Sequence, residues 1–146
     1  MTIAIIGAGL AGASAAVELR EQGYDGDIVL VGAEPHAPYE RPPLSKDILL
    51  RTGTAADAAV KDDGWYEEHR VELVTGCAAT DLDLSARTFA VADRKVDYDE
   101  LLIATGATSR HLPMVDESGA PFAYLRTIEE SEALRKNLTG HLLIIG

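Results

Sequence analysis

Short apolar runs, separated by glycine-rich or polar segments, recur along the chain. Three of these runs are almost wholly apolar, namely residues 2–6, 28–31 and 101–104. Such runs are typical of strands buried on both faces of a parallel sheet. Between the first two, residues 13–22 are rich in alanine and predict a helix that ends at Gly23. The first 34 residues therefore predict one parallel strand–helix–strand unit.

The pattern changes to alternation between residues 77 and 98, where apolar and polar positions follow one another. This alternation predicts an antiparallel meander appended to the parallel sheet, after a further strand at 71–74. Residues 35–46 hold four of the six prolines and predict an extended loop. A short helix is expected to start near Leu44, directly after a proline.

Two more elements are expected near the end of the chain. Thr127 and Glu130 have the spacing of a capping box, which predicts a helix from there to about Leu138. Residues 142–145 form another apolar run and predict another buried strand. Together these elements predict an α/β fold in which a parallel sheet carries an antiparallel β-meander.

Composition and charge narrow the function classes. The 146 residues include 13 Lys and Arg against 24 Asp and Glu, for a net charge of −11. This balance argues against nucleic-acid binding, which requires a basic face. No export signal and no apolar run of membrane-spanning length is present, so a cytoplasmic location away from membranes is expected. The single cysteine, Cys77, excludes an internal disulfide, and the four histidines lack ligand spacing, so no metal site is predicted.

The first apolar run leads directly into Gly7-x-Gly9-x-x-Gly12, which opens the predicted helix. In this context Gly7 allows a tight turn, Gly9 lets a pyrophosphate approach the backbone, and Gly12 lets the helix pack closely. Glu34 follows the second strand at the distance expected of a ribose-binding acid. Its carboxylate favours a ribose without a 2′-phosphate. The motif predicts a Rossmann-like dinucleotide site and leaves FAD and NAD as alternatives.

Four segments together resemble one family: IAIIGAGLAG, YERPPLSKD, YDELLIATGA and YLRT. They are similar to the NADH-dependent ferredoxin reductases that serve multicomponent oxygenases. The resemblance runs from Thr2 to Gly146. It implies a flavoprotein with an FAD-binding domain of the glutathione-reductase type, which takes electrons from NAD(P)H and passes them through FAD to a ferredoxin-type iron–sulfur protein.

The resemblance also implies roles for individual residues. Gly7, Gly9, Leu10, Ala11 and Gly12 would hold the FAD pyrophosphate, and Glu34 the adenosine ribose. Arg41 and Lys46 would approach the pyrophosphate and the flavin ring, with Lys46 as the catalytic residue. The other implied FAD contacts are Ala79 through its backbone to the adenine, Thr105, Gly106 and Arg126.

The resemblance further implies a domain division. Residues 1–113 would form the first segment of a discontinuous FAD-binding domain. Residues 114–146 would form a crossover and the first strand and first glycine of a truncated NAD-binding domain, so most of the NAD(P)H site would lie outside this chain. Two alternatives stay open: another acceptor, such as rubredoxin or a nitrite reductase partner, and a non-catalytic dinucleotide-binding module.

Overall fold

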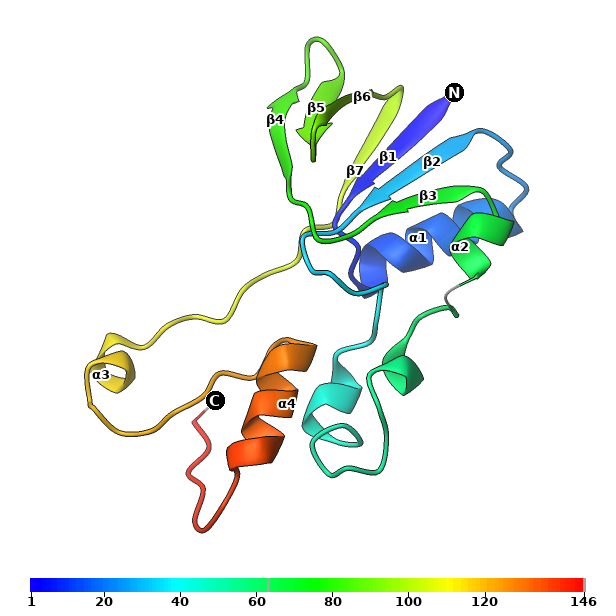
Figure 1. Cartoon of the computed structure of the whole chain (residues 1–146). Coiled ribbons are helices and arrows are strands. Elements are labelled where there is room, and N and C mark those ends of the chain that lie inside the picture. The colour runs from blue at the N-terminus through cyan, green and yellow to red at the C-terminus, as the bar shows by residue number, and fades with distance from the viewer. Residues whose placement is uncertain (63, 146) are drawn as a thin grey trace. The chain divides into compact units, whose positions relative to one another are not determined.

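The computed structural model describes residues 1–62 and 64–145 of the chain, which fall into two compact units (Figure 1). The first unit contains residues 1–40 and 59–106. The second contains residues 41–58 and the chain from residue 107 onward. Gly146, the predicted first glycine of an NAD-binding domain, lies outside the described residues.

A four-stranded parallel sheet forms the centre of the first unit, in the order β3-β2-β1-β7. Its strands are β1 (Thr2–Ile6), β2 (Asp27–Val31), β3 (Val71–Val74) and β7 (Glu100–Ile103). A separate antiparallel sheet consists of β4 (Ala79–Asp83), β5 (Thr88–Val91) and β6 (Arg94–Asp97). Two helices, α1 (Leu10–Glu21) and α2 (Trp65–Glu68), complete this unit.

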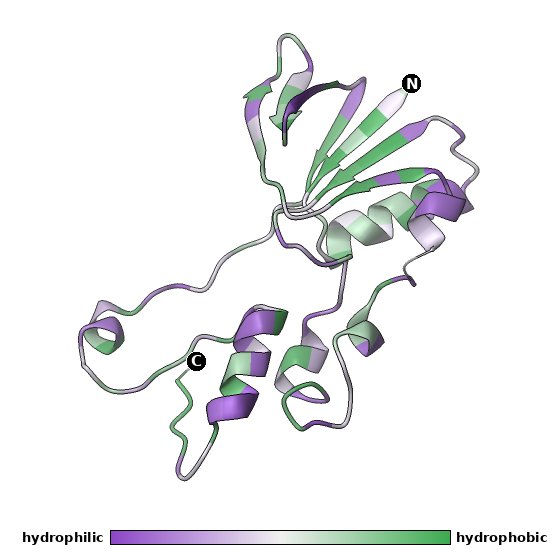
Figure 2. Ribbon diagram, viewed as in Figure 1, coloured by the Kyte–Doolittle hydropathy of each residue, from purple (hydrophilic) through white to green (hydrophobic). Residues whose placement is uncertain are grey.

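The two faces of the parallel sheet bury separate cores, because successive side chains of a strand point to opposite faces. On one face Ile5, Ile28 and Leu30 pack with α1 and α2. On the other face Ala4, Val29 and Val31 pack against the antiparallel sheet. These five- and four-residue strands are green along most of their length in Figure 2, as burial on both faces requires. The first unit is therefore three-layered, and the predicted α/β fold with its β-meander is confirmed.

Tyr66 of α2 lies in the helix-side core, where its side chain is 3% exposed. Its hydroxyl has no hydrogen-bond partner among the described residues. Because burial disfavours the phenolate, it raises the pKa of Tyr66 to about 12.

Arg20 joins two separate turns of the first unit. Its guanidinium donates to the carbonyl oxygens of Tyr24 and Gly26 at 2.6 and 2.8 Å, just after α1. It also donates to the carbonyls of His69 and Arg70, each at 2.7 Å, between α2 and β3. One planar cation thus satisfies four backbone acceptors at the amino ends of β2 and β3.

Three elements of the structure differ from their predictions, two in their length and one in its burial. The first helix begins at Leu10 rather than Ala13, because the glycine motif itself contributes its first turn. The helix expected near Leu44 is a single 3₁₀ turn, η1 (Pro42–Ser45), followed by further turns. The run 101–104 is not buried on both faces. Its strand β7 is an edge strand of the described sheet, and Leu102 and Ile103 are exposed by 40% and 59% because no described element covers them fully.

The second unit is built around α4 (Ile128–Asn137) and η1. Thr127 caps α4 by accepting from the Glu130 N–H at 3.3 Å, while the Glu130 side chain accepts from the Thr127 N–H at 3.2 Å. The predicted capping box is therefore present. Ser131 on the buried face of α4 donates to the carbonyl of Leu44 at 2.6 Å, which fastens the helix to η1.

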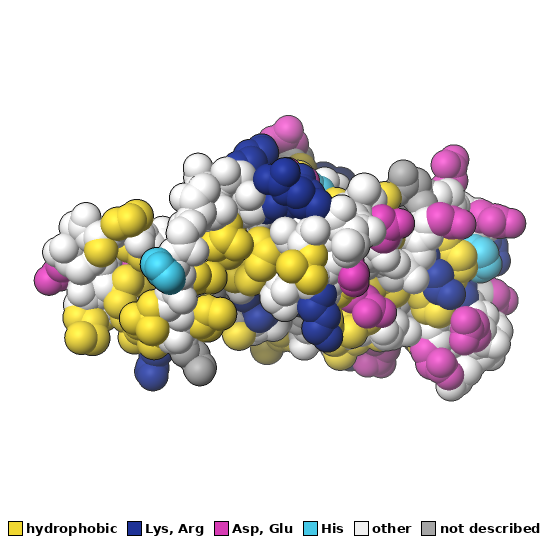
Figure 3. Space-filling model, turned by 90° about the horizontal axis from the view of Figure 1, so that it is seen from below, with side chains coloured by type: hydrophobic (Ala, Val, Ile, Leu, Met, Phe, Trp, Pro, Cys, Tyr) yellow, Lys and Arg dark blue, Asp and Glu magenta, His cyan; other side chains and the backbone are white. Residues whose placement is uncertain are grey.

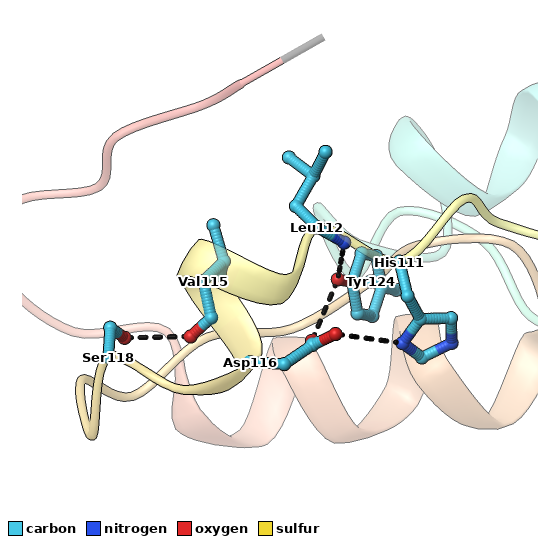
Figure 4. A network of polar contacts seen from close by, with 6 residues as sticks. All are labelled: His111, Leu112, Val115, Asp116, Ser118 and Tyr124. Carbon is cyan, nitrogen blue, oxygen red and sulfur yellow. Dashed lines mark hydrogen bonds and ion pairs between the residues drawn. The ribbon is translucent and has the colours of Figure 1, made fainter.

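A small polar network orders the segment that contains α3 (Pro113–Asp116) (Figure 4). The Tyr124 hydroxyl accepts from the backbone N–H of Leu112 at 3.0 Å and donates to Asp116 at 2.9 Å. His111 lies 3.4 Å from the other oxygen of Asp116 and packs against the Tyr124 ring. This four-residue α-helix was absent from the elements predicted by periodicity, because it is too short to show any.

The strand predicted at residues 142–145 is absent. These residues have no regular secondary structure, and the side chains of Leu143 and Ile144 are 83% and 82% exposed. A strand requires a neighbour for its backbone groups, and none of the described strands pairs with this run. Figure 3 shows hydrophobic side chains on one face of the molecule.

Candidate functional site

The loops that follow β1, β2 and β7 leave the same edge of the parallel sheet, because these strands run in the same direction. The chain passes from β1 to β2 on one side, whereas β7 lies on the other side of β1. Open α/β sheets bind ligands at such a point, beyond the carboxyl ends of the strands. The glycine motif Gly7–Gly12 occupies this position in the first unit.

The structure gives a different explanation for glycine at each of the three motif positions. Gly7 has a φ of +118°, and a Cβ atom there would lie 2.1 Å from the Ala104 carbonyl oxygen after β7. A Cβ on Gly12 would lie 1.9 Å from the Gly7 carbonyl oxygen and 3.1 Å from the Ile5 side chain. Both glycines are therefore required by close packing within the unit.

Gly9 is different, because nothing in the described structure requires a glycine there. Its φ of −83° and ψ of −173° are accessible to any residue. Apart from Gly9 itself and its two chain neighbours, no atom of the described residues lies within 4 Å of the position that a Cβ would take. The space in front of this backbone is open, which is the arrangement expected where a ligand approaches the main chain.

The open space lies at the N-terminus of α1. The amides of Leu10, Ala11 and Gly12 occupy the first turn, where a helix offers no internal acceptor. Among the described residues no side chain caps this end, and the first turn holds no acidic residue. These N–H groups and the positive end of the helix dipole favour an anion such as a phosphate.

Glu34 is held at the same edge by backbone contacts with the loop after β3. Its carbonyl oxygen accepts from the Gly76 N–H at 2.8 Å, and Gly32 accepts from the Cys77 N–H at 3.2 Å. Gly32 itself allows the close approach of the glycine motif, because a Cβ there would lie 2.6 Å from the Ala8 Cβ. Sequence reasoning missed this role of Gly32, whose only signal was its place directly after β2.

The Glu34 carboxylate accepts a hydrogen bond from the hydroxyl of Tyr39. Tyr39 is 7% exposed and its ring meets that of His36 edge-on, with the centroids 6.2 Å apart. The sequence left the role of Tyr39 open, and the structure shows that it contacts the predicted ribose-binding acid.

The other predicted site residues of the first unit lie near these loops in the chain. Thr105 and Gly106 follow β7 and are exposed. A Cβ atom added to Gly7 would lie 2.7 Å from the Thr105 backbone nitrogen. Ala79 begins β4, two residues after Cys77, and is half-buried. Cys77 packs at the margin of the core between the two sheets.

The remaining predicted residues belong to the second unit. The Arg41 guanidinium donates to the backbone carbonyl of Arg126, so the structure brings these two residues together. The Arg126 Nε atom is buried and has no hydrogen-bond partner among the described residues. Lys46 ends η1 and is exposed.

The described residues contain neither a metal-binding cluster nor a membrane-spanning helix. No group of three or more His, Cys, Asp or Glu side chains in that part of the chain is arranged to hold a metal ion. None of its helices is long and apolar enough to cross a membrane.

Comparison with known proteins places this geometry in a wider group. The sequence model of the pyridine nucleotide-disulphide oxidoreductases matches residues 1–146. The ferredoxin–NAD(+) reductase component of the p-cumate 2,3-dioxygenase system from Pseudomonas putida is 42% identical over 147 residues, covering 99% of this chain and 36% of that protein. The rubredoxin–NAD(+) reductase of Pseudomonas putida is 36% identical over 139 residues, covering 94% of this chain and 36% of that protein.

Solved structures show the same likeness. The crystal structure of the covalent putidaredoxin reductase–putidaredoxin complex matches with a TM-score of 0.86 and 34% sequence identity, over 92% of this chain and 33% of that chain. The present chain thus spans about a third of the length of the curated relatives and the solved structure that it matches.

Proposed function

Because the chain belongs to the pyridine nucleotide-disulphide oxidoreductase family, we propose that it is the FAD-binding part of an enzyme that passes electrons from NAD(P)H to a ferredoxin-type iron–sulfur protein. The open space at Gly9 carries the proposal. A glycine with ordinary dihedral angles and no neighbouring protein atom stands at an uncapped helix N-terminus, where packing does not explain it. A pyrophosphate approaching the backbone does explain it.

The residues of the first unit fit the adenosine diphosphate portion of FAD. In the proposal, the amides of Leu10, Ala11 and Gly12 donate to the pyrophosphate, with Gly7 and Gly9 shaping the loop. The Glu34 carboxylate accepts hydrogen bonds from the ribose hydroxyls, and the Ala79 backbone contacts the adenine. Thr105 and Gly106, next to Gly7, line the cofactor. We assign these roles from the placement of the residues and from the resemblance of their motifs.

We further propose that Arg41, Lys46 and Arg126 bind the same cofactor. The buried Nε of Arg126 has no acceptor among the described residues, and a buried donor without a partner is costly. A pyrophosphate or flavin oxygen would supply that acceptor. Lys46, exposed at the end of η1, is proposed to act beside the flavin ring. In this proposal residues 1–113 belong to the FAD-binding domain and residues 114–146 lead into the NAD-binding domain.

Bound FAD supplies the redox chemistry, by accepting a hydride from NAD(P)H and releasing its two electrons one at a time. The protein residues bind and orient the cofactor. The chain contains one cysteine, so it holds no dithiol pair through which electrons could be relayed. We therefore propose that the electrons leave the flavin directly for the external acceptor, in the cytoplasm.

One relative favours a second candidate acceptor. The rubredoxin–NAD(+) reductase is 36% identical over nearly the same residues, so rubredoxin is the alternative to a ferredoxin. A nitrite reductase partner has no specific observation in its favour. The non-catalytic dinucleotide-binding module differs from both because it would bind the nucleotide portion without any preference for the flavin.

Binding and electron transfer test the proposal in two steps. The chain is first titrated with FAD while flavin fluorescence is recorded, and ADP is then added as a competitor. Tight FAD binding that ADP displaces is expected. A protein that binds ADP and FAD with equal affinity would instead support the nucleotide-binding module.

In the second step, the FAD-loaded chain is reduced anaerobically with a stoichiometric amount of dithionite, so that no free reductant is left, and is mixed with an oxidised [2Fe–2S] ferredoxin or with rubredoxin. Faster reoxidation by the ferredoxin is the expected result. Faster reoxidation by rubredoxin would replace the ferredoxin with the second candidate. Reoxidation by neither protein would contradict the proposed electron transfer while leaving FAD binding intact.

A further inference from the structure

The backbone of Glu34 is fixed, but its side chain has three rotatable bonds. The hydrogen bonds from Gly76 to Glu34 and from Cys77 to Gly32 hold the main chain of this segment against the loop after β3. A glutamate side chain loses about 1.5–2 kcal/mol of rotamer entropy when it is immobilised. A ligand that needs one carboxylate orientation therefore binds more tightly if that orientation already exists in the free protein.

Tyr39 is placed to supply such an orientation. Its backbone forms an isolated antiparallel bridge with Ala59, and the neighbouring Pro38 carbonyl accepts from the Val60 N–H at 2.9 Å. Pro38 is fully buried and Tyr39 is 7% exposed. These contacts fix the backbone at Tyr39, and burial restricts its ring. The Tyr39 hydroxyl donates to Oε2 of Glu34.

The chemistry of the pair leaves the carboxylate able to bind a ribose. An ionised carboxylate accepts hydrogen bonds at about four lone-pair positions on its two oxygens. The Tyr39 hydroxyl occupies one position on Oε2 and fixes the plane of the group. Hydrogen bonds to an ionised acceptor are roughly twice as strong as neutral ones, so one bond is enough to bias the rotamer.

We propose that Tyr39 is a positioning residue, whose hydroxyl holds the Glu34 carboxylate in the orientation that accepts hydrogen bonds from both hydroxyls of an adenosine ribose. The inference rests on the proposed function, because it assumes that the nucleotide lies at this edge of the sheet. Tyr39 acts through Glu34 and has no direct contact with the ribose in this proposal.

The test measures how strongly binding depends on the ribose hydroxyls. The dissociation constants of ADP and of 2′,3′-dideoxy-ADP are measured by calorimetry for the 146-residue chain, and their ratio is the diol preference. The wild-type chain should prefer ADP by about 10- to 100-fold, as hydrogen bonds to a charged group predict. Tyr39→Phe keeps the ring and should lower this preference about fivefold.

Two further variants separate positioning from packing. Glu34→Gln should lose most of the diol preference, and adding Tyr39→Phe to it should change the preference by less than about twofold, because the carboxylate is already gone. Tyr98→Phe is the matched control. Tyr98 is another buried tyrosine of the first unit, and its hydroxyl has no partner among the described residues. This variant should keep the wild-type preference. Thermal unfolding of each variant checks that the fold is retained.

Each result decides between the possibilities. If Tyr39→Phe keeps the wild-type diol preference, or binds ADP more tightly because the hydroxyl competes with the ribose, Tyr39 is no positioning residue and the proposed FAD site stands. If the wild-type chain shows no diol preference, or no ADP binding at all, the proposed function fails and this inference with it.

Discussion

Replacing Gly9 with alanine should separate ligand binding from stability. A Cβ at this position meets no protein atom within 4 Å, and the φ of −83° is ordinary for alanine. Gly9 is the N-cap of α1, where alanine is less favourable than glycine, but alanine also restricts the unfolded chain, so we expect the free energy of unfolding to change by less than about 1 kcal/mol. The same methyl group stands where the proposed pyrophosphate approaches the first turn of α1. The loss of one or two amide–phosphate hydrogen bonds should weaken FAD binding by about 10- to 100-fold.

Gly12→Ala provides the contrast in stability. Its Cβ would lie 1.9 Å from the Gly7 carbonyl oxygen, a backbone atom that cannot rotate away. Relieving such overlap requires movement of the loop or of α1, at a cost of about 3 kcal/mol. Gly64→Ala is the matched control for Gly9. Gly64 precedes α2 with a φ of −82° and also has open space around its Cβ position, so this variant should change neither property.

Urea unfolding followed by circular dichroism gives the stabilities, and FAD titration by fluorescence gives the affinities. The expected pattern is a stable Gly9→Ala chain that binds FAD poorly beside a destabilised Gly12→Ala chain. A Gly9→Ala variant that binds FAD within twofold of the wild type would refute the assignment of the open space to the pyrophosphate. Destabilisation as large as that of Gly12→Ala would refute the claim that packing leaves the position free.

Three further predictions concern the stability of the two units. Burial raises the pKa of Tyr66 to about 12, whereas in the unfolded chain the phenol releases its proton near pH 10. The stability that the neutral Tyr66 side chain contributes is therefore complete below pH 10 and is lost between pH 10 and about 12. In urea unfolding, Tyr66→Phe should lack this part of the alkaline loss of stability, and a pH profile identical to that of the wild type would contradict the reasoning. A lysine in place of Arg20 cannot donate to all four carbonyls, because it lacks the planar guanidinium, so Arg20→Lys should lower the free energy of unfolding in urea by about 2 kcal/mol. Unchanged stability would show that water replaces these hydrogen bonds at no cost. Thr127→Ala removes the capping hydrogen bond of α4 and should cost about 1 kcal/mol, seen as faster amide hydrogen exchange in the first turn, while Thr127→Ser retains protection.

Elements with a local cause were predictable from the sequence. The unit β1–α1–β2 follows from two apolar runs and a glycine motif that adjoin one another. The capping box at Thr127 likewise depends on residues three positions apart. In these cases the residues that decide the structure are neighbours in the chain, so pattern and geometry coincide.

Features that depend on distant neighbours were not predictable. The exposure of Ile103 on the edge strand β7 depends on which distant elements cover the strand, and the apolar run does not reveal this. The requirement for Gly32 comes from the Ala8 side chain, which the fold places above it. The contact between Tyr39 and Glu34 depends on the path of the proline-rich loop, which the bridge to Ala59 fixes. The apolar run 142–145 shows the converse, because strand propensity alone does not create a strand without a neighbour.

The contact behind Gly7 has a consequence for the order of folding. The Ala104 carbonyl, against which the loop packs, is far from Gly7 in the sequence. It lies beside Gly7 only when β7 has paired with β1. We expect such a long-range pairing to form late, because the chain must close a large loop before the contact is gained. A phosphate-bearing ligand that selects the finished loop would therefore also stabilise the pairing of β1 with β7. In the proposed function, cofactor binding and the pairing of β1 with β7 would therefore be one coupled equilibrium.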